Sequence, residues 1–199
     1  MRPRHLHRIG AGVLGAFAVI HLGNHLAGIA GQEVHGQVLA ALRAIYRQPL
    51  IEPLLVLAVG TQIASGLRLA LPRLRHGLRA NWASAQTLAG LYLALFLTIH
   101  VAAVLAARAQ GAETDLAFAA TAFKAGGLWP WVFAPYYGLA VLALGLHLSA
   151  PLARRQPHMA RALTGVAVLT SGALVLLLAG LLTPISIPAA QIAAFPLMP

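Results

Sequence analysis

The chain alternates long apolar runs with short polar connectors. Five of these runs reach the roughly 20 residues that a helix needs to cross a bilayer. They lie at about residues 9–30, 51–71, 84–107, 129–150 and 163–182. The runs and their connectors occupy nearly all of the 199 residues. The pattern therefore predicts an all-α membrane protein, a bundle of five transmembrane helices in which residues 1–199 form a single domain.

The first connector has a helical period of its own. Apolar side chains recur there every three or four residues, at Val34, Val38, Leu42 and Ile45. Arg43 and Arg47 share a neighbouring face of the same helix. We expect a short amphipathic helix over about residues 33–47 that lies in the membrane interface and ends before Pro49.

Basic residues are concentrated on one side of the predicted membrane. They occur before the first span, between the second and third, and between the fourth and fifth, at Arg2, Arg4, Arg8, Arg68, Arg73, Arg75, Arg79, Arg154, Arg155 and Arg161. The other connectors mix both signs, and the tail after Leu182 has no charged side chain. The positive-inside bias therefore predicts a cytoplasmic N-terminus and a C-terminus outside.

Composition supports this class and excludes others. Hydrophobic residues make up 59% of the chain and charged ones 9%, whereas soluble domains carry about 25% charged residues. Topology accounts for the formal charge of +10, so we expect no nucleic-acid partner. Without cysteine, the chain cannot form Cys-ligated zinc sites, iron–sulfur clusters or covalently attached haem. The Ala-, Leu- and Arg-rich composition suggests a bacterial inner (cytoplasmic) membrane protein.

Three histidines lie inside apolar runs, His21 and His25 in the first span and His100 in the third. A ring nitrogen in hydrocarbon costs roughly several kcal/mol unless something binds it. Residues four apart on a helix project from one face, so His21 and His25 point the same way. A ligand that bridges two helices would satisfy these rings, and haem b is the first candidate.

Depth favours one pairing. His25 follows Arg8 by 17 residues, and His100 follows Ser84 by 16 residues. At 1.5 Å per residue both lie about 25 Å along their helices. The sequence thus predicts His25 and His100 as axial ligands of one haem, in the outer half of the membrane, with His21 as the alternative to His25.

Nearby polar residues have secondary roles in this hypothesis. Asn24 would orient a ligand ring or contact the haem edge, and Arg43 and Arg47 would bind the anionic propionates. His35, just outside the first span, is expected at the surface or on the propionate side. Glu52 would pair with one of these arginines or relay a proton.

His147 stands apart from these residues. It lies near the cytoplasmic edge of the fourth span, too far from His25 and His100 to share a haem with them. We expect it to reach the membrane interface. A second haem is the less favoured alternative, with His7, His76 or His158 as the other ligand.

The motifs resemble those of the fumarate reductase and succinate dehydrogenase cytochrome b membrane-anchor superfamily. The similarity lies in the five spans, in His21-Leu-Gly-Asn-His25 and in Thr98-Ile-His100. A second block, residues 42–52 followed by residues 62–68, is similar to a mitochondrial branch of distant relatives. The resemblance covers about the first half of the chain. It implies b-type haem held by histidines of different helices, a quinone site near a membrane face, and partner flavoprotein and iron–sulfur subunits.

One departure from this pattern matters. The five-helix anchors that hold two haems have a histidine in four helices, whereas the second and fifth spans here have none. The resemblance therefore implies one haem and leaves a second without its usual ligands. Whether soluble dehydrogenase subunits dock, and whether electrons cross the whole membrane, stays open.

These observations predict a b-type haem-binding membrane protein that transfers electrons to or from quinone or an outside redox partner. It would be a quinone-linked oxidoreductase or the membrane anchor subunit of one, with Glu52 or Tyr46 delivering protons. One alternative is a divalent-metal site on His21, His25 and His100. The other is a non-redox scaffold subunit whose histidines are satisfied by hydrogen bonds. The physiological donor and acceptor stay open, as does a homo-oligomer.

Overall fold

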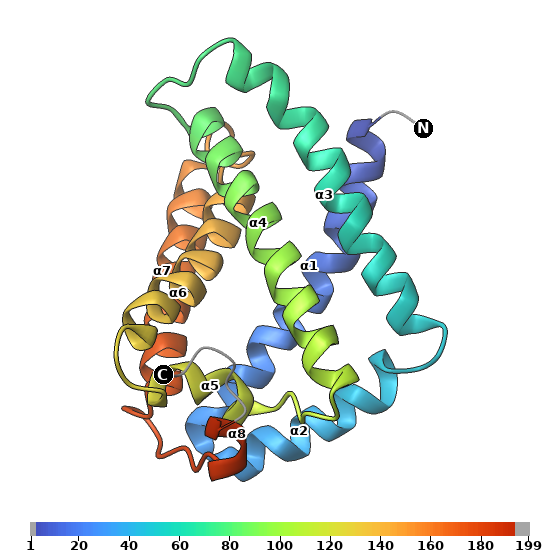
Figure 1. Ribbon diagram of the computed structural model, residues 1–199. Coiled ribbons are helices and arrows are strands. Elements are labelled where there is room, and N and C mark those ends of the chain that lie inside the picture. Colours follow the sequence, from blue (N-terminus) through green and yellow to red (C-terminus); the bar gives the residue numbers. More distant parts are fainter. Residues whose placement is uncertain (1–2, 194–199) are drawn as a thin grey trace.

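Figure 1 shows a computed structural model that describes residues 3–193. Arg2, part of the basic N-terminal segment, lies outside these residues. The described residues form helices joined by short connectors and contain no strand. Its helices are α1 (Pro3–Ala27), the 3₁₀ turn η1 (Gly28–Ala30), α2 (Gln32–Tyr46), α3 (Ile51–Arg75), α4 (Trp82–Ala109), α5 (Leu116–Lys124), α6 (Trp129–Ser149), α7 (Pro157–Leu178) and α8 (Ala189–Ala193).

The predicted all-α membrane fold is confirmed. Five of the described helices, α1, α3, α4, α6 and α7, are long and apolar enough to cross a membrane, and their most apolar windows have mean hydropathies of 1.5 to 2.2. Only 6–33% of each window is buried inside the chain. Most of the apolar surface therefore faces outward, where lipid is the matching solvent.

The helices differ from the predicted spans at their ends. α1 begins at Pro3 and α3 runs on to Arg75, because backbone hydrogen bonds continue after the apolar run has stopped. The prediction was furthest off for the fifth span. α7 begins at Pro157, a residue suited to the first helical turn, and ends at Leu178. Gly180 follows with a φ of +73°, a conformation that closes a helix.

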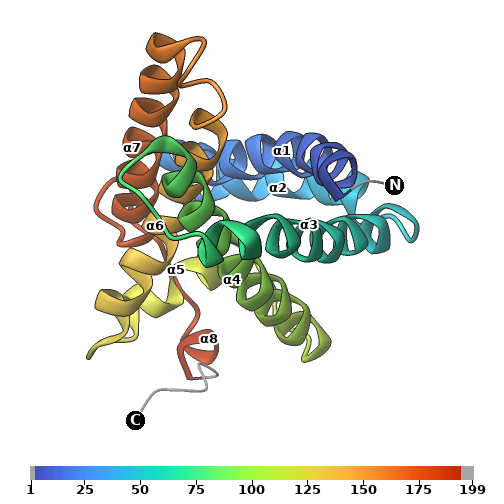
Figure 2. The ribbon, with the colours of Figure 1, turned by 90° about the horizontal axis from the view of Figure 1, so that it is seen from above.

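The membrane-crossing helices pack in a chain of neighbours. α1 packs against α3, α3 against α4, α4 against α6, and α6 against α7; Figure 2 shows this arrangement from above. A Cβ on Gly145 would collide with Ala167, so the glycine lets α6 and α7 approach closely. Buried residues of α5, α6 and α7 form the tightest apolar cluster, at Leu116, Ala120, Val141, Leu174, Leu177 and Leu178.

Short helices gather at one end of the bundle, called here the α2 end (Figure 1). The predicted amphipathic helix is confirmed as α2, which begins after Gly31 turns the chain with a φ of +135°. No helix was predicted between the third and fourth spans, where the structure has α5. Asp115 caps it by accepting a hydrogen bond from the Phe118 N–H at 3.0 Å, a favourable helix start.

Candidate functional site

Four histidines converge at the α2 end. His21 and His25 come from α1, His35 from α2 and His100 from α4, and we call them the four-histidine cluster. The ring centres of His21 and His25 are 4.7 Å apart, and those of His25 and His35 are 5.5 Å apart. The centre of the His100 ring is 6.2 Å from that of His21. The structure thus brings together all three histidines that the sequence singled out.

The spacing between His21 and His100 suits two ligands of one metal atom. Metal–imidazole bonds of about 2 Å, made from opposite sides, put the two ring centres about 6 Å apart. The depth estimate preferred His25 over His21 as the partner of His100. In the structure His21 is the ring in contact with His100, while His25 lies between His21 and His35.

The cluster leaves most of its ring nitrogens without protein partners. Among the described residues, no hydrogen bond reaches the rings of His21, His25 or His100, and Nδ1 of His25 is fully buried and unpaired. A buried polar atom without a partner costs about 1–3 kcal/mol. Two such buried atoms lie at the cluster, Nδ1 of His25 and Oδ1 of Asn24, as expected of a site that binds an added ligand.

Asn24 connects α1 to α2 within the cluster. Its Nδ2 donates to Nε2 of His35 at 3.1 Å, so that His35 carries its proton on Nδ1. Asn24 is 3% exposed and its Oδ1 has no partner. Of the two positions expected for His35, the surface was wrong, because the residue is only 2% exposed; the propionate side stays a prediction. The sequence held a signal for this, since His35 is in helical register with Leu39 and Leu42, which face the bundle.

His35 lies outside the membrane-spanning helices, and its surroundings shift the pKa of its ring. Burial lowers the pKa of its imidazole, Asp115 partly opposes this effect, and the positive charge of Arg43 adds to it. The ring is therefore neutral near neutral pH.

The arginines of α2 are held by the connector before α5. Arg43 pairs with Glu113 at 3.0 Å, and Nη2 of both Arg43 and Arg47 donates to Oγ1 of Thr114, at 3.2 and 3.1 Å. Nε of each arginine is buried without a partner. Glu52 was expected to pair with one of them. It forms a two-pronged ion pair with Arg108 of α4 instead.

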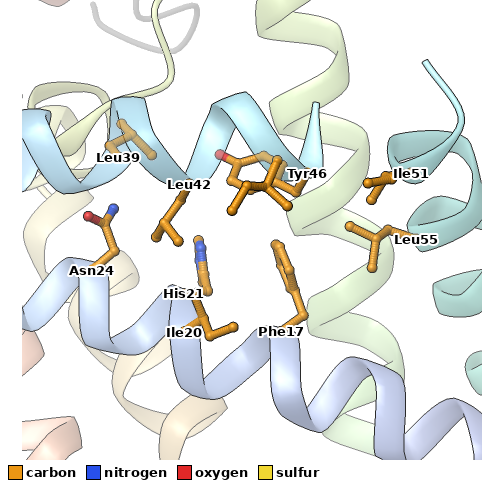
Figure 3. Close-up of a pocket in the computed structure, with 10 residues that line it drawn as sticks. Phe17, Ile20, His21, Asn24, Leu39, Leu42, Tyr46, Ile51 and Leu55 are labelled. Atoms are coloured by element: carbon orange, nitrogen blue, oxygen red, sulfur yellow. The ribbon is translucent and has the colours of Figure 1, made fainter. Parts of the chain in front are cut away.

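A cavity of about 230 Å³ lies beside the cluster, between α1, α2 and the start of α3 (Figure 3). Its lining is mostly apolar, at Phe17, Ile20, Leu39, Leu42, Ile45, Ile51 and Leu55. The polar members are His21, Asn24 and Tyr46. His21 therefore touches both this cavity and His100.

A second group, the two-histidine pair, lies at the other end of the bundle. The ring centre of His7 on α1 is 6.1 Å from that of His147 on α6. Ser65 Oγ donates to the Gln62 carbonyl and so accepts from Nδ1 of His7 at 3.1 Å. Nε2 of His7 accepts from Gln62 Nε2 at 3.3 Å, and Nδ1 of His147 donates to the Gln86 carbonyl at 3.0 Å. Of the three histidines considered as the other ligand of a second haem, His7 is the one whose ring contacts His147 in the described residues; the second haem stays a prediction.

The described residues contain no group of three or more His, Cys, Asp or Glu side chains that could hold a metal ion. In the four-histidine cluster the rings lie against one another and do not surround a common point. This geometry suits a ligand held by two imidazoles better than a bare ion held by three.

No protein family model, curated protein or solved structure matches this chain.

Proposed function

We propose that the chain is a b-type haem-binding membrane protein that exchanges electrons with quinone or with an outside redox partner. The observation that carries the proposal is the pair His21 and His100, two imidazoles from different helices with ring centres 6.2 Å apart and no hydrogen bonds of their own among the described residues. In the bacterial inner membrane, with the N-terminus in the cytoplasm, this pair would lie in the outer half of the bilayer.

The chain's residues fit the group. His21 of α1 and His100 of α4 would hold the iron, with His25 as the alternative to His21. Arg43 and Arg47 would neutralise the propionates. Among the described residues the acid that pairs with one of them is Glu113, whose side chain is 75% exposed and can move aside. When bound, haem supplies reversible one-electron chemistry, and the helices tune its potential through ligand type, hydrogen bonds and exclusion of water.

The hydrogen bond between Asn24 and His35 has a supporting part in this proposal. It ties α1 to α2 beside His25 and fixes which nitrogen of His35 carries the proton. Partners of this kind orient the ligating rings in metal centres. Asn24 and His35 would therefore be positioning residues, not iron ligands.

The test is a reduced-minus-oxidised visible spectrum of the purified protein, with a pyridine haemochrome assay for stoichiometry. We expect a sharp b-type α band, about one haem per chain, and loss of both in His100→Ala. His147→Ala is the matched control, because it removes a membrane histidine at the other end of the bundle. A colourless protein after expression with ample haem would refute the proposal.

Two other functions predict different results in the same experiment. A divalent-metal protein would be colourless or weakly coloured, and metal analysis would find an ion that His100→Ala removes. A scaffold subunit would keep its assembly with partner subunits in His100→Ala. A quinone-linked activity is proposed only for the haem-containing protein. Pull-down with the intact protein would identify soluble dehydrogenase partners.

A further inference from the structure

A second pocket lies at the end of the bundle away from α2, where a connector joins α3 to α4 (Figure 1). Two arginines line it, Arg73 in the last turn of α3 and Arg79 in the connector, and we call it the arginine pocket. Its volume is about 180 Å³, below the roughly 300–1,000 Å³ of pockets that enclose a drug-sized ligand. It has room for a small polar group with the rest of the ligand outside.

Hydrogen bonds hold the walls of the arginine pocket in place. Nη1 of Arg73 donates to Oγ1 of Thr87 at 3.3 Å, and Thr87 is only 4% exposed. The backbone N–H of Arg79 donates to Oγ of Ser84 at 2.9 Å, after Gly77 has turned the chain with a φ of +80°. Because these groups are already ordered, a ligand that binds between them loses less entropy in doing so.

The positive charge of the arginine pocket has no counter-charge within the chain. The four acidic residues, Glu33, Glu52, Glu113 and Asp115, all lie at the α2 end. Arg73 follows Glu52 by 21 residues on the same helix, which corresponds to about 31 Å. Salt screens exposed charges beyond about 10 Å. An anion that neutralises the pocket must therefore come from outside the protein.

The rim of the arginine pocket is apolar and faces the membrane. Leu78, which lines the pocket, is 42% exposed, and Trp82 at the start of α4 is 40% exposed. Exposed tryptophan is typical of the level of the lipid head groups. A phospholipid offers a phosphate to the guanidinium groups and an acyl chain to Leu78. Free phosphate would leave the apolar rim without a partner.

From these observations we infer that the arginine pocket binds the phosphate of an anionic membrane phospholipid between Arg73 and Arg79, with an acyl chain against Leu78. The inference does not depend on haem. With the predicted cytoplasmic N-terminus, the pocket would lie on the cytoplasmic face. Basic pockets on that face are suited to anionic head groups.

The test titrates the full-length protein in detergent with phosphatidylglycerol and counts the bound lipids by native mass spectrometry. We expect one tight site per chain, and weaker binding of phosphatidylcholine, because its choline cation neutralises the phosphate. The double variant Arg73→Gln, Arg79→Gln should weaken the first phosphatidylglycerol site by roughly tenfold or more, since hydrogen bonds between charged groups are the strong ones.

The matched control is the double variant Arg154→Gln, Arg155→Gln. It removes the same charge from the connector between α6 and α7, at the same end of the bundle but outside the lining of the pocket. It should keep the first phosphatidylglycerol site. Circular dichroism and thermal unfolding establish that each variant folds. If the pocket variant does not fold, Arg79→Gln alone replaces it, because no hydrogen bond or ion pair of this guanidinium occurs among the described residues.

A competition with inorganic phosphate separates the two sources of the anion. We expect phosphate at the same concentration to leave the lipid bound. Displacement of the lipid would overturn the inference and assign the pocket to a free anion. Equal losses in the two double variants would also overturn it, because they would show an effect of the whole charged face. So would phosphatidylcholine bound as tightly as phosphatidylglycerol.

Discussion

The two groups of membrane histidines differ in what their nitrogens do. In the two-histidine pair, both nitrogens of His7 and Nδ1 of His147 have partners within the chain. In the four-histidine cluster, the one hydrogen bond made by a ring within the described residues is that of His35 with Asn24. A buried unpaired group costs about 1–3 kcal/mol, so the cluster would gain from a ligand. In the pair the three named ring nitrogens have partners, and the buried atom left unpaired beside them is Oε1 of Gln62.

Packing also distinguishes the two groups, because the pair is tightly packed and the cluster is not. A Cβ on Gly90 would lie 2.9 Å from Cε1 of His147, and one on Gly66 would lie 3.3 Å from Cε1 of His7. The rings of the pair therefore occupy the space that these two glycines leave. The cluster instead lies beside a cavity of about 230 Å³. The presence of histidine in a span is thus a weaker indication of a ligand site than its hydrogen bonding and packing.

Removing one histidine from each group should have opposite consequences. His21→Ala should lose all or nearly all bound haem, because it removes the ring in contact with His100. His7→Ala should keep its haem and lose stability instead, by about 1–3 kcal/mol, since Ser65 and Gln62 lose a partner. The α band per chain and the thermal unfolding midpoint, measured on both variants, separate the two outcomes. If His25→Ala loses haem and His21→Ala does not, the depth estimate was right and the ring contact misleading.

A smaller effect concerns the packing of the pair. Gly90→Ala should destabilise the protein by about 1–3 kcal/mol, because the new methyl group overpacks the His147 ring. Gly12→Ala is the matched control, since a Cβ there meets nothing within 4 Å. Alanine favours a helix over glycine by about 1 kcal/mol, so this control should be neutral or slightly stabilising. Denaturant unfolding in detergent, followed by circular dichroism, measures the free energy of unfolding of both variants. An equal loss of stability in the two would refute the tight packing of Gly90 against His147.

Within the cluster, His35 should make the stability of the protein depend on pH. Burial lowers the pKa of His35 in the folded chain below 6.5, the usual value for histidine. The unfolded chain therefore binds more protons as pH falls through that value, and stability falls with it until pH drops below the folded pKa. His35→Gln keeps an acceptor for Asn24 but does not titrate. Between about pH 7.5 and pH 5.5 the variant should lose less of its unfolding midpoint than the native chain.

An equal loss in the two proteins would assign the acid sensitivity to other groups. Asp115 and Arg43 act on His35 from α5 and α2 in opposite directions, and each is present in both proteins. The difference between the native chain and His35→Gln therefore isolates the imidazole.

The sequence carried enough information for the helices and for the three central histidines. Length and apolarity predict each span, and the four-residue spacing of His21 and His25 places both on one face of α1. The α2 helix could be read from its period because one side is apolar and the other charged. α5 lacked such a signal, since it is a short segment whose start depends on the Asp115 cap.

Contacts between helices were harder to predict from the sequence. The ranking of His25 over His21 rested on counting from Arg8 and Ser84, but α1 begins at Pro3 and α4 at Trp82. Helix rotation, not depth alone, decides which ring meets His100. Arg108 likewise reaches Glu52 because α3 and α4 pack side by side, which no local pattern shows.

The smallest effect tests which of two residues moves protons in the proposed function. Both Glu52 and Tyr46 were candidates for moving protons, but only Tyr46 lines the cavity, and Glu52 is engaged by Arg108. Glu52→Gln should therefore leave the rate at which a short-tail quinol reduces the haem unchanged. It should lower stability by at most about 1 kcal/mol, because both side chains of the ion pair are 27% exposed. Tyr46→Phe should slow the same reaction several-fold with stability retained. A rate that falls in Glu52→Gln but not in Tyr46→Phe would move the proton route away from the cavity and toward the interface between α3 and α4.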